Sequence, residues 1–456
     1  MAVTRKIHPE LPVFRISSGG FDVLYAPGHA IPVESGEATT VERIFQDRIS
    51  PQNARCWALA TQLETFAQEA VYAWEQLRCV PFHPECLTIY LSNQCNLRCA
   101  YCYSATVDGG RERGGGLPII DETAVKAAAR LVARSCHDKA KRFTFALQGG
   151  GEPTTHWDLL KRTVALSREA AQEQGIEWWG YIATNGVLVE ERVRWLAAHF
   201  DRIGLSCDGS AVDQDAQRPM MGGADTSEWV RRTARVLGDS GVDFTVRVTV
   251  TPQTADRQAA IVRYACETLG ARTVRLEPAF GAGPRQHENF APADAPRFVD
   301  RFLEARAVAA SLGCEVGLSS VRLDEIHGPF CNVLREVLNL TPDGTATACF
   351  LATDGRTVED APLVIGRLDR RSGEFVLDRS VIDGMRRRAT QIPARCHECA
   401  NVYHCARDCP DVCPVLEDDH GDEGGFRCLV QKRLGEALIA ERGRMVPTAA
   451  SSARVA

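Results

Sequence analysis

Apolar and polar residues alternate in a regular strand–helix pattern from about residue 87 to residue 313. Short apolar runs indicate strands that are buried on both faces. The six predicted strands are 87–91, 143–147, 178–183, 202–206, 244–251 and 273–277. Amphipathic stretches typical of helices follow them at 121–136, 157–174, 190–200, 227–237, 255–269 and 294–312. Asp121 is a good N-cap for the first of these helices, and Gly175 is a good C-terminal stop for the second.

Six strand–helix units in succession predict a parallel sheet with right-handed crossovers. Because six units are present and there is no sign of eight, we expect a partial (β/α)6 barrel rather than a closed one, and the fold class is α/β. Functional residues should then gather at the C-terminal ends of the strands.

The segments on either side of this pattern read differently. Residues 1–85 predict a small N-terminal α/β accessory domain, with a hairpin of 21–25 and 31–33 followed by helices at 41–47 and 53–76. The expected barrel covers 86–315, and a cysteine-rich domain covers 320–438. Segment 444–456 is rich in small and polar residues, and we predict that it is a disordered tail.

Composition narrows the class of protein. The chain has 456 residues and a formal net charge of -6, which argues against a general nucleic-acid binder. No apolar stretch approaches the ~18–20 residues of a membrane span, and the N-terminus lacks the apolar core of a secretory signal. We therefore expect a cytoplasmic protein that binds neither nucleic acid nor membrane.

The chain has 18 cysteines, and their placement suggests more than one role. Cytosolic thiols stay reduced, so clustered cysteines there favour metal binding or redox chemistry. Two groups are clustered, one between residues 95 and 102 and one between residues 331 and 428. The scattered remainder reads as buried core residues: Cys56, Cys79, Cys86, Cys136, Cys207, Cys266 and Cys314.

The first group has the spacing C-x3-C-x2-C and follows the first predicted strand. Cys95, Cys99 and Cys102 are suited to hold three irons of a [4Fe–4S] cluster and leave the fourth iron open for a ligand. Zinc is the alternative, but a closed structural zinc site needs four ligands, and no fourth Cys or His is near in sequence.

With this motif, the chain resembles the radical S-adenosylmethionine (SAM) superfamily. The resemblance implies that Tyr101 packs on the SAM adenine, that Gly150 and Gly151 approach the SAM amino group, and that the Glu152 carboxylate faces it. It implies further SAM contacts from Thr184, Asn185, Ser206 and Arg218, in segments that resemble the family's TNG and S-x-D-G…R patterns. Asn-Gly and Asp-Gly pairs also form ordinary turns, which is the alternative for Asn185 and Asp208.

The second cysteine group resembles the SPASM extension of radical SAM enzymes that modify peptides and proteins. The resemblance implies two auxiliary [4Fe–4S] clusters, in addition to the SAM-binding one. Cys331, Cys349 and Cys409 would hold the first, and Cys396, Cys399, Cys405 and Cys428 the second. Cys413 or Cys314 would complete the first set unless that cluster has an open iron; a zinc ribbon is the alternative for the whole array.

The resemblance implies an enzyme in which a 5′-deoxyadenosyl radical abstracts a hydrogen from a ribosomally made peptide or a protein. The product would carry a thioether, carbon–carbon or ether cross-link, or an oxidised residue. A formylglycine-forming enzyme of the anaerobic sulfatase-maturing type is an alternative, weakened because Phe350 follows Cys349 where that type has an Asp. A non-catalytic zinc-binding adaptor and a small-molecule radical SAM enzyme remain as further alternatives.

The resemblance also implies partners: a precursor peptide or protein, and an electron donor such as flavodoxin or ferredoxin. The N-terminal domain is expected either to bind a leader peptide or to cap the barrel. No residue is singled out as catalytic beyond the cofactor-binding set.

Overall fold

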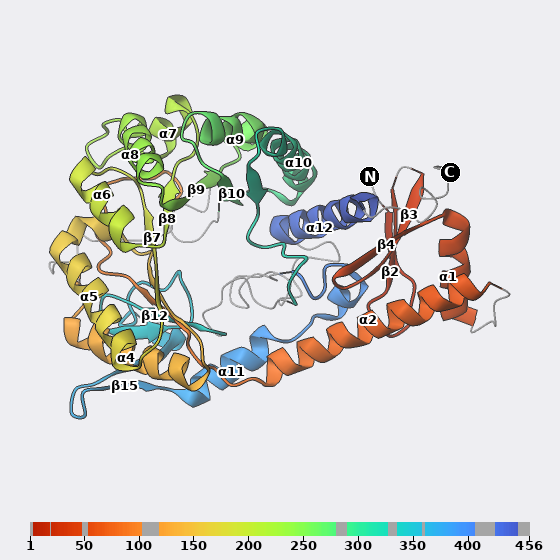
Figure 1. The fold of residues 1–456 in the computed structure, drawn as a ribbon, viewed down its shortest axis with the longest axis horizontal. Helices are drawn as coiled ribbons and strands as arrows, with labels where there is room; N and C mark the ends of the chain where they lie inside the picture. The colour runs from red at the N-terminus through yellow and green to blue at the C-terminus, as the bar shows by residue number, and fades with distance from the viewer. Residues whose placement is uncertain are drawn as a thin grey trace.

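The computed structural model of the chain describes residues 3–18, 20–47, 53–102, 118–279, 290–326, 335–357, 361–405 and 425–445. No helix in these ranges is long and apolar enough to cross a membrane. Three regions lie side by side: a strand–helix region, a C-terminal region and an N-terminal sheet with its helices (Figure 1).

The six predicted strand–helix units are present. Their strands are β5 (Cys86–Ile89), β6 (Phe143–Leu147), β7 (Trp178–Thr184), β8 (Arg202–Ser206), β9 (Asp243–Val250) and β10 (Thr273–Pro278). Their helices are α4 (Glu122–Asp138), α5 (Trp157–Glu173), α6 (Glu190–His199), α7 (Ala211–Gln217), α8 (Ser227–Ser240), α9 (Gln258–Glu267) and α10 (Ala295–Ser311). The Asp121 side chain accepts a hydrogen bond from the Thr123 N–H and so caps α4, as expected.

The sheet extends beyond the predicted strands at both ends. Short β11 (Glu315–Gly317) pairs in parallel with β10, and β12 (Val337–Leu340) pairs in parallel with β5. The antiparallel strands β13 (Thr345–Thr347), β14 (Val364–Asp369) and β15 (Glu374–Leu377) continue from β12. The sheet is therefore open, with β11 and β15 at its edges, and the cysteine-rich region continues the sheet of the partial barrel.

The helices cover the outer face of this sheet, and Figure 1 shows α4 to α10 in an arc around the strands. Buried residues of β9 such as Val246 and Val248 share one apolar core with Val262 of α9 and Phe298 of α10. Burying a side chain of this kind contributes about 1.5–3 kcal/mol to folding. The intervening residues of each strand face the inner side of the curved sheet.

The N-terminal region forms a separate antiparallel sheet of β1 (Val3–Lys6), β2 (Phe14–Ser18), β3 (Phe21–Ala26) and β4 (His29–Val33). The expected hairpin is confirmed as β3 and β4, whereas β1 and β2 were not predicted. One face of the sheet packs on α1 (Ser35–Asp47) and α2 (Ala54–Cys79), and the other packs on α12 (Phe426–Met445). These contacts join the N-terminal sheet to the C-terminal region.

The remaining helix of the C-terminal region, α11 (Arg379–Ala389), follows β15. Helix α12 continues through Met445, so it includes residues 444 and 445, which the sequence assigns to the tail. Residues 446–456 lie outside the described part of the chain.

Candidate functional site

The first cysteine motif lies in the loop that follows β5, at the C-terminal edge of the sheet. Backbone hydrogen bonds join this loop to the segment after α7: the Arg98 N–H donates to the Pro219 carbonyl and the Ala100 N–H to the Gln217 carbonyl, both at 2.8 Å. A bridge between Leu97 and Met220 continues this pairing beside the Arg98–Pro219 bond. The loop that carries the cysteines is therefore fixed by the end of the β8–α7 unit, which lies across the sheet from β5.

The three cysteines of this loop are half-buried, and the Cys95, Cys99 and Cys102 thiols lie close enough to influence one another's ionisation. Burial, with a smaller contribution from the charges of Glu152, Cys99 and Cys102, raises the pKa of Cys95 to about 12. Burial raises the pKa of Cys99 to about 11, against the opposing effect of the Arg218 charge. Buried thiols of this kind ionise only when a cation is close, and cluster iron supplies that charge. The donor set therefore fits the three-cysteine side of a [4Fe–4S] cluster.

The glycine run after β6 packs directly against the cysteine loop. The Gly151 N–H donates to the Ser92 carbonyl at 3.1 Å, and the Glu152 N–H donates to the Gln94 carbonyl at 2.9 Å. A Cβ at Gly151 would lie 2.0 Å from the Gln94 carbonyl oxygen, so only glycine fits there. Gly150 has a positive φ of 65°, and a Cβ there would lie 2.8 Å from the Asn93 side-chain oxygen. This packing holds the glycine run beside the cysteine motif.

Glu152 differs from its expected role. Its side chain is 5% exposed and accepts four hydrogen bonds, one each from the N–H and the hydroxyl of Thr154, from the Thr184 hydroxyl and from the Asn185 N–H. Burial raises its pKa above the ordinary value, although these donors oppose the shift. The Glu152 carboxylate therefore joins the loops after β6 and β7 and does not stand open to a ligand ammonium group.

Asn185 connects the loop after β7 to the first cysteine. Its side-chain amide donates to the Asn96 side-chain oxygen at 2.8 Å and lies 4.0 Å from the Cys95 sulfur. Its own oxygen accepts from the Val187 N–H at 3.0 Å. The structure thus brings Asn185 to the cysteine loop, and the contacts of Thr184 and Asn185 with SAM stay a prediction.

Tyr101, Asp208 and Arg218 form a buried polar network next to Cys99. The Tyr101 hydroxyl donates to Asp208 Oδ2 at 2.5 Å, and Arg218 makes a bidentate ion pair with the same carboxylate. The Arg218 guanidinium lies 5.3 Å from the centre of the Tyr101 ring. The proposed adenine-stacking ring is therefore held at its hydroxyl end and at one ring face. Ser206, at the end of β8, makes no side-chain hydrogen bond within the described ranges.

The segment after Cys349 contacts the loop that leads to Cys95. The Tyr90 hydroxyl donates to the Phe350 carbonyl at 2.7 Å, and the Asn93 amide donates to the Thr353 carbonyl at 3.0 Å. Asn93 in turn contacts Gly150. Cys349 is buried, and this arrangement brings a predicted ligand of the first auxiliary cluster toward the glycine run.

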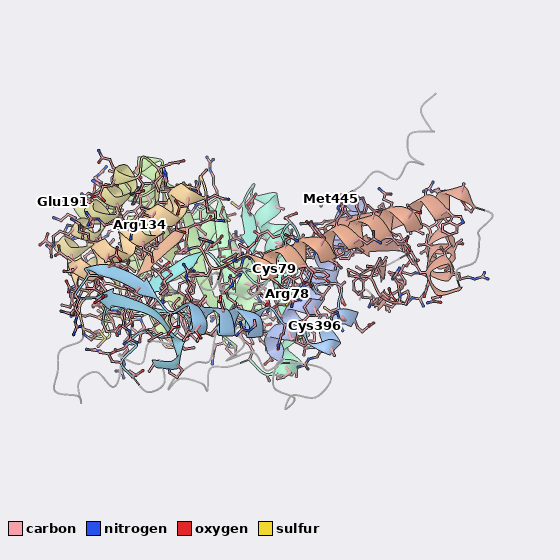
Figure 2. The ribbon with its side chains drawn as sticks, turned by 90° about the horizontal axis from the view of Figure 1, so that it is seen from below. Arg78, Cys79, Arg134, Glu191, Cys396 and Met445 are labelled. Atoms are coloured by element: carbon pink, nitrogen blue, oxygen red, sulfur yellow. The ribbon has the colours of Figure 1, made fainter. Side chains whose placement is uncertain are left out.

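The other described cysteines of the array gather around the start of α12. Burial, with a smaller contribution from the neighbouring Cys396 and Cys428, raises the pKa of Cys399 to about 12. Cys428 lies in the first turn of α12, and the Cys405 thiol donates to the Gln431 side chain one turn later. In Figure 2, Cys396 lies beside the end of α2, where it packs with Trp74 and Leu77. The set predicted for the second auxiliary cluster is thus assembled in one place.

The remaining candidates separate into two groups. Cys331, Cys409 and Cys413 lie outside the described residues. Cys314 hydrogen-bonds to the Ala271 carbonyl before β10 and lies next to Cys266, at the N-terminal edge of the sheet. The Cys349 carbonyl accepts from the Asn339 amide of β12, on the other side of β5 from β10 and β11. This separation along the sheet does not favour Cys314 as a ligand of the first auxiliary set, and the ligand that completes the set stays a prediction.

Within the described ranges, no three His, Cys, Asp or Glu side chains are arranged to hold a single metal ion. In a four-iron cluster each cysteine binds a different iron, which is a wider arrangement than the ligands of one ion. Sequence reasoning missed Tyr90 and Asn93, because their partners are 260 residues away and no local pattern marks them.

Three comparisons agree with this geometry. Residues 89–265 match the model of the radical SAM superfamily. The serine-type anaerobic sulfatase-maturating enzyme of Klebsiella aerogenes is 28% identical over 224 residues, which are 49% of this chain and 53% of that protein. The chain therefore matches about half the length of this curated relative.

Solved structures share the fold over more of the chain. Native anSMEcpe with bound AdoMet superposes with a TM-score of 0.61 at 18% identity, covering 80% of this chain and 100% of that one. Streptococcus suis SuiB bound to the precursor peptide SuiA superposes with a TM-score of 0.52 at 16% identity, covering 90% of this chain and 97% of that one. Residues 89–265 therefore carry a radical SAM domain.

Proposed function

We propose that the protein is a radical SAM maturase that modifies a ribosomally made peptide or a protein. The observation that carries this proposal is the assembly at the C-terminal edge of the sheet: Cys95, Cys99, the glycine run and the Tyr101–Asp208–Arg218 network lie together. Cys95, Cys99 and Cys102 would hold the [4Fe–4S] cluster, and SAM would supply the 5′-deoxyadenosyl radical when bound there.

This chain's own residues have positioning roles in the proposed reaction. Glu152 and Asn185 fix the position of the glycine run relative to the cysteine loop, through the hydrogen bonds that join Glu152 to Asn185 and Asn185 to Asn96. Asp208 and Arg218 hold the Tyr101 ring, which would stack on the adenine. Because Glu152 is saturated by protein donors, backbone groups of the glycine run are the candidates for holding the SAM amino group.

Two further proposals concern the rest of the chain. The C-terminal cysteines would hold two auxiliary [4Fe–4S] clusters, and Cys396, Cys399, Cys405 and Cys428 have the arrangement that supports the second. Among the described residues, the core clusters of the N-terminal sheet include α1, α2 and α12 and no barrel helix, which favours a leader-peptide domain over a barrel cap. Its edge strands β1 and β4 offer backbone groups to which a peptide strand can pair.

Formylglycine formation in a sulfatase is the second candidate, favoured by the similarity to the Klebsiella enzyme. The position after Cys349 holds Phe350, whose carbonyl is taken by Tyr90. That position therefore provides no carboxylate base, and cross-linking or oxidation of a peptide is the better supported chemistry.

The test is anaerobic reconstitution with iron and sulfide, followed by SAM, dithionite and short peptides encoded beside the gene. We expect 5′-deoxyadenosine together with a peptide whose mass falls by about two hydrogens, since each cross-link forms by loss of two hydrogen atoms. A Ser- or Cys-containing sulfatase peptide converted to formylglycine would instead establish the second candidate. A protein that binds zinc and no iron would contradict both candidate functions.

A further inference from the structure

Gln431 is a buried glutamine on the face of α12 that carries Cys428. The two residues are three positions apart in the helix, so their side chains are neighbours on its surface. Gln431 is 2% exposed. Because Cys428 belongs to the set predicted for the second auxiliary cluster, the Gln431 side chain faces the same set.

The Gln431 side chain contacts a second member of this set. The Cys405 thiol donates a hydrogen bond to the Gln431 side-chain oxygen. Cys405 lies in the segment that precedes α12, so this hydrogen bond joins two separate parts of the C-terminal region. Gln431 therefore contacts one predicted ligand and lies one helical turn from another.

Contacts with Asn401 fix this turn of α12 relative to Cys405. The Asn401 side-chain amide donates to the Gln431 carbonyl at 2.7 Å, and the Asn401 carbonyl accepts from the Cys405 N–H at 2.8 Å. A Cβ at Gly435 would lie 2.2 Å from the Asn401 amide nitrogen, so glycine permits the close approach of Asn401 to the helix. The placement of Gln431 beside Cys405 thus has support besides the thiol contact.

The direction of the hydrogen bond has to reverse when Cys405 binds iron. A ligating cysteine is a thiolate, which has no proton to donate and only accepts hydrogen bonds. The carboxamide of glutamine carries an acceptor oxygen and a donor nitrogen of similar size, and a half-turn of the group exchanges them. The Gln431 amide N–H would then donate to the Cys405 sulfur.

N–H donors already face two other predicted ligands. The Leu97 N–H donates to the Cys95 sulfur and the Leu351 N–H to the Cys349 sulfur, both at 3.4 Å. These are backbone hydrogen bonds within a loop, which a substitution does not remove. The Gln431 contact comes from a side chain of another element, so its effect can be measured by mutation.

The surroundings of the set increase the effect of such a hydrogen bond. Trp74 of α2 packs with Val402, Tyr403 and Cys396 in one apolar cluster. Hydrogen bonds are electrostatically stronger in such low-dielectric surroundings. Hydrogen bonds to the sulfurs are among the factors that set the reduction potential of an iron–sulfur cluster. An N–H directed at a ligand sulfur favours the reduced cluster, because the reduced cluster carries one more negative charge.

We propose that Gln431 raises the reduction potential of the second auxiliary cluster by donating a hydrogen bond to the Cys405 thiolate. Gln431 acts through Cys405 and is therefore a positioning residue. The inference rests on the proposed function, since it concerns a cluster predicted for that enzyme.

A higher potential matters for the proposed oxidation of a peptide. Loss of two hydrogens sends one hydrogen atom to the 5′-deoxyadenosyl radical and leaves one electron and one proton on the substrate radical. The proton can leave to solvent, whereas the electron needs an acceptor. A cluster with a raised potential accepts that electron more readily.

The test measures the reduction potential of this cluster in the reconstituted full-length protein, by electron paramagnetic resonance of samples poised at defined potentials. The signal of this cluster is the one that Cys428→Ser lacks. Gln431→Met keeps the length of the side chain without the N–H donor, and the ionised carboxylate of Gln431→Glu only accepts hydrogen bonds. We expect Gln431→Met to lower the equilibrium constant for reduction about tenfold, which is a shift of about 59 mV to more negative potential. Gln431→Glu should lower it at least as much.

Gln46→Met on α1 is the matched control. Gln46 is exposed, and α1 packs with the first half of α2, whereas Cys396 lies beside the end of α2. This variant should leave the reduction potential unchanged. Iron content is measured on every sample.

Unchanged potentials in both Gln431 variants would overturn the inference. Loss of the cluster signal from both variants would also overturn it, by assigning Gln431 a structural role alone, as would a wild type without a Cys428-dependent signal. Formation of 5′-deoxyadenosine is measured separately on the wild type. Shifted potentials in the Gln431 variants, together with no 5′-deoxyadenosine from the wild type, would contradict the proposed function alone.

Discussion

Arg218 and Asp208 form a buried bidentate ion pair, with Nε donating to Oδ2 at 2.9 Å and a terminal nitrogen donating to Oδ1 at 3.1 Å. The Tyr101 hydroxyl donates to the same carboxylate. Since Tyr101 immediately precedes Cys102, this ion pair connects the end of β8 to the cluster loop.

Asp208→Asn should lower the free energy of unfolding by about 3–5 kcal/mol, because it leaves the Arg218 charge buried without its partner. Tyr101→Phe removes only the hydroxyl and should cost about 1.5–3 kcal/mol, the range for a hydrogen bond to a charged group. Denaturant unfolding of both variants checks that Asp208→Asn lowers the free energy of unfolding more than Tyr101→Phe does. An Asp208→Asn protein as stable as the wild type would contradict the pairing.

Glu152→Gln should destabilise the protein by about 1–3 kcal/mol, since an amide group then meets donors that converge on a carboxylate. Glu191→Gln on exposed α6, labelled in Figure 2, is the matched control and should be neutral. Burial raises the Glu152 pKa, so the folded state binds the proton more tightly than the unfolded chain.

The sign of the pH dependence follows from that raised pKa. Protonated Glu152 stabilises the fold at pH values below 4.5, the pKa of this carboxyl group in the unfolded chain. That stabilisation is lost as the pH rises through the higher pKa of the folded state. The stability advantage of the wild type over Glu152→Gln should therefore shrink as pH rises above 4.5. An advantage that grows over this range in urea unfolding would contradict it.

Gly151→Ala should separate the glycine run from the cysteine loop, because the new Cβ meets the Gln94 backbone at 2.0 Å. We expect loss of 5′-deoxyadenosine formation with the auxiliary iron retained. Gly222→Ala in the neighbouring segment has no atom within 4 Å of its Cβ and should keep full activity. Equal activity of the two variants would show that the close approach is not needed.

Cys428→Ser should remove about four of about twelve irons, the content of one [4Fe–4S] cluster out of three. Cys428 is close to Cys399 and belongs to the set around the start of α12. Cys79 at the end of α2 belongs to no set, and it is exposed, so the expectation that it is a buried core residue was wrong. Cys79→Ser should keep all the iron. Iron and sulfide analysis after anaerobic reconstitution distinguishes these outcomes. If the Cys428→Ser variant binds as much iron as the wild type, Cys428 is not a ligand of the cluster.

Local sequence patterns predicted the parts of the fold and site that depend on local physics. The spacing of Cys95, Cys99 and Cys102 and the apolar runs of β5 to β10 are visible within a few residues. Strands β11 and β12 have only three and four residues, too short for a pattern, so the continuation of the sheet was missed.

Long-range contacts were beyond such reasoning. The hydrogen bond from Tyr90 to Phe350 joins residues that are 260 positions apart, and no local sequence pattern near either residue predicts it. The protein donors to Glu152 were missed for a similar reason, because they come from two separate loops that meet only in the folded sheet.

The central claim, that Cys95, Cys99 and Cys102 support radical cleavage of SAM, is tested most directly by 5′-deoxyadenosine formation. Wild type and a Cys95→Ala, Cys99→Ala, Cys102→Ala variant are reconstituted anaerobically and incubated with SAM and dithionite. We predict 5′-deoxyadenosine from the wild type and none from the variant, which should retain the iron of the auxiliary clusters. No 5′-deoxyadenosine from an iron-loaded wild type, or equal amounts from both proteins, would contradict the claim.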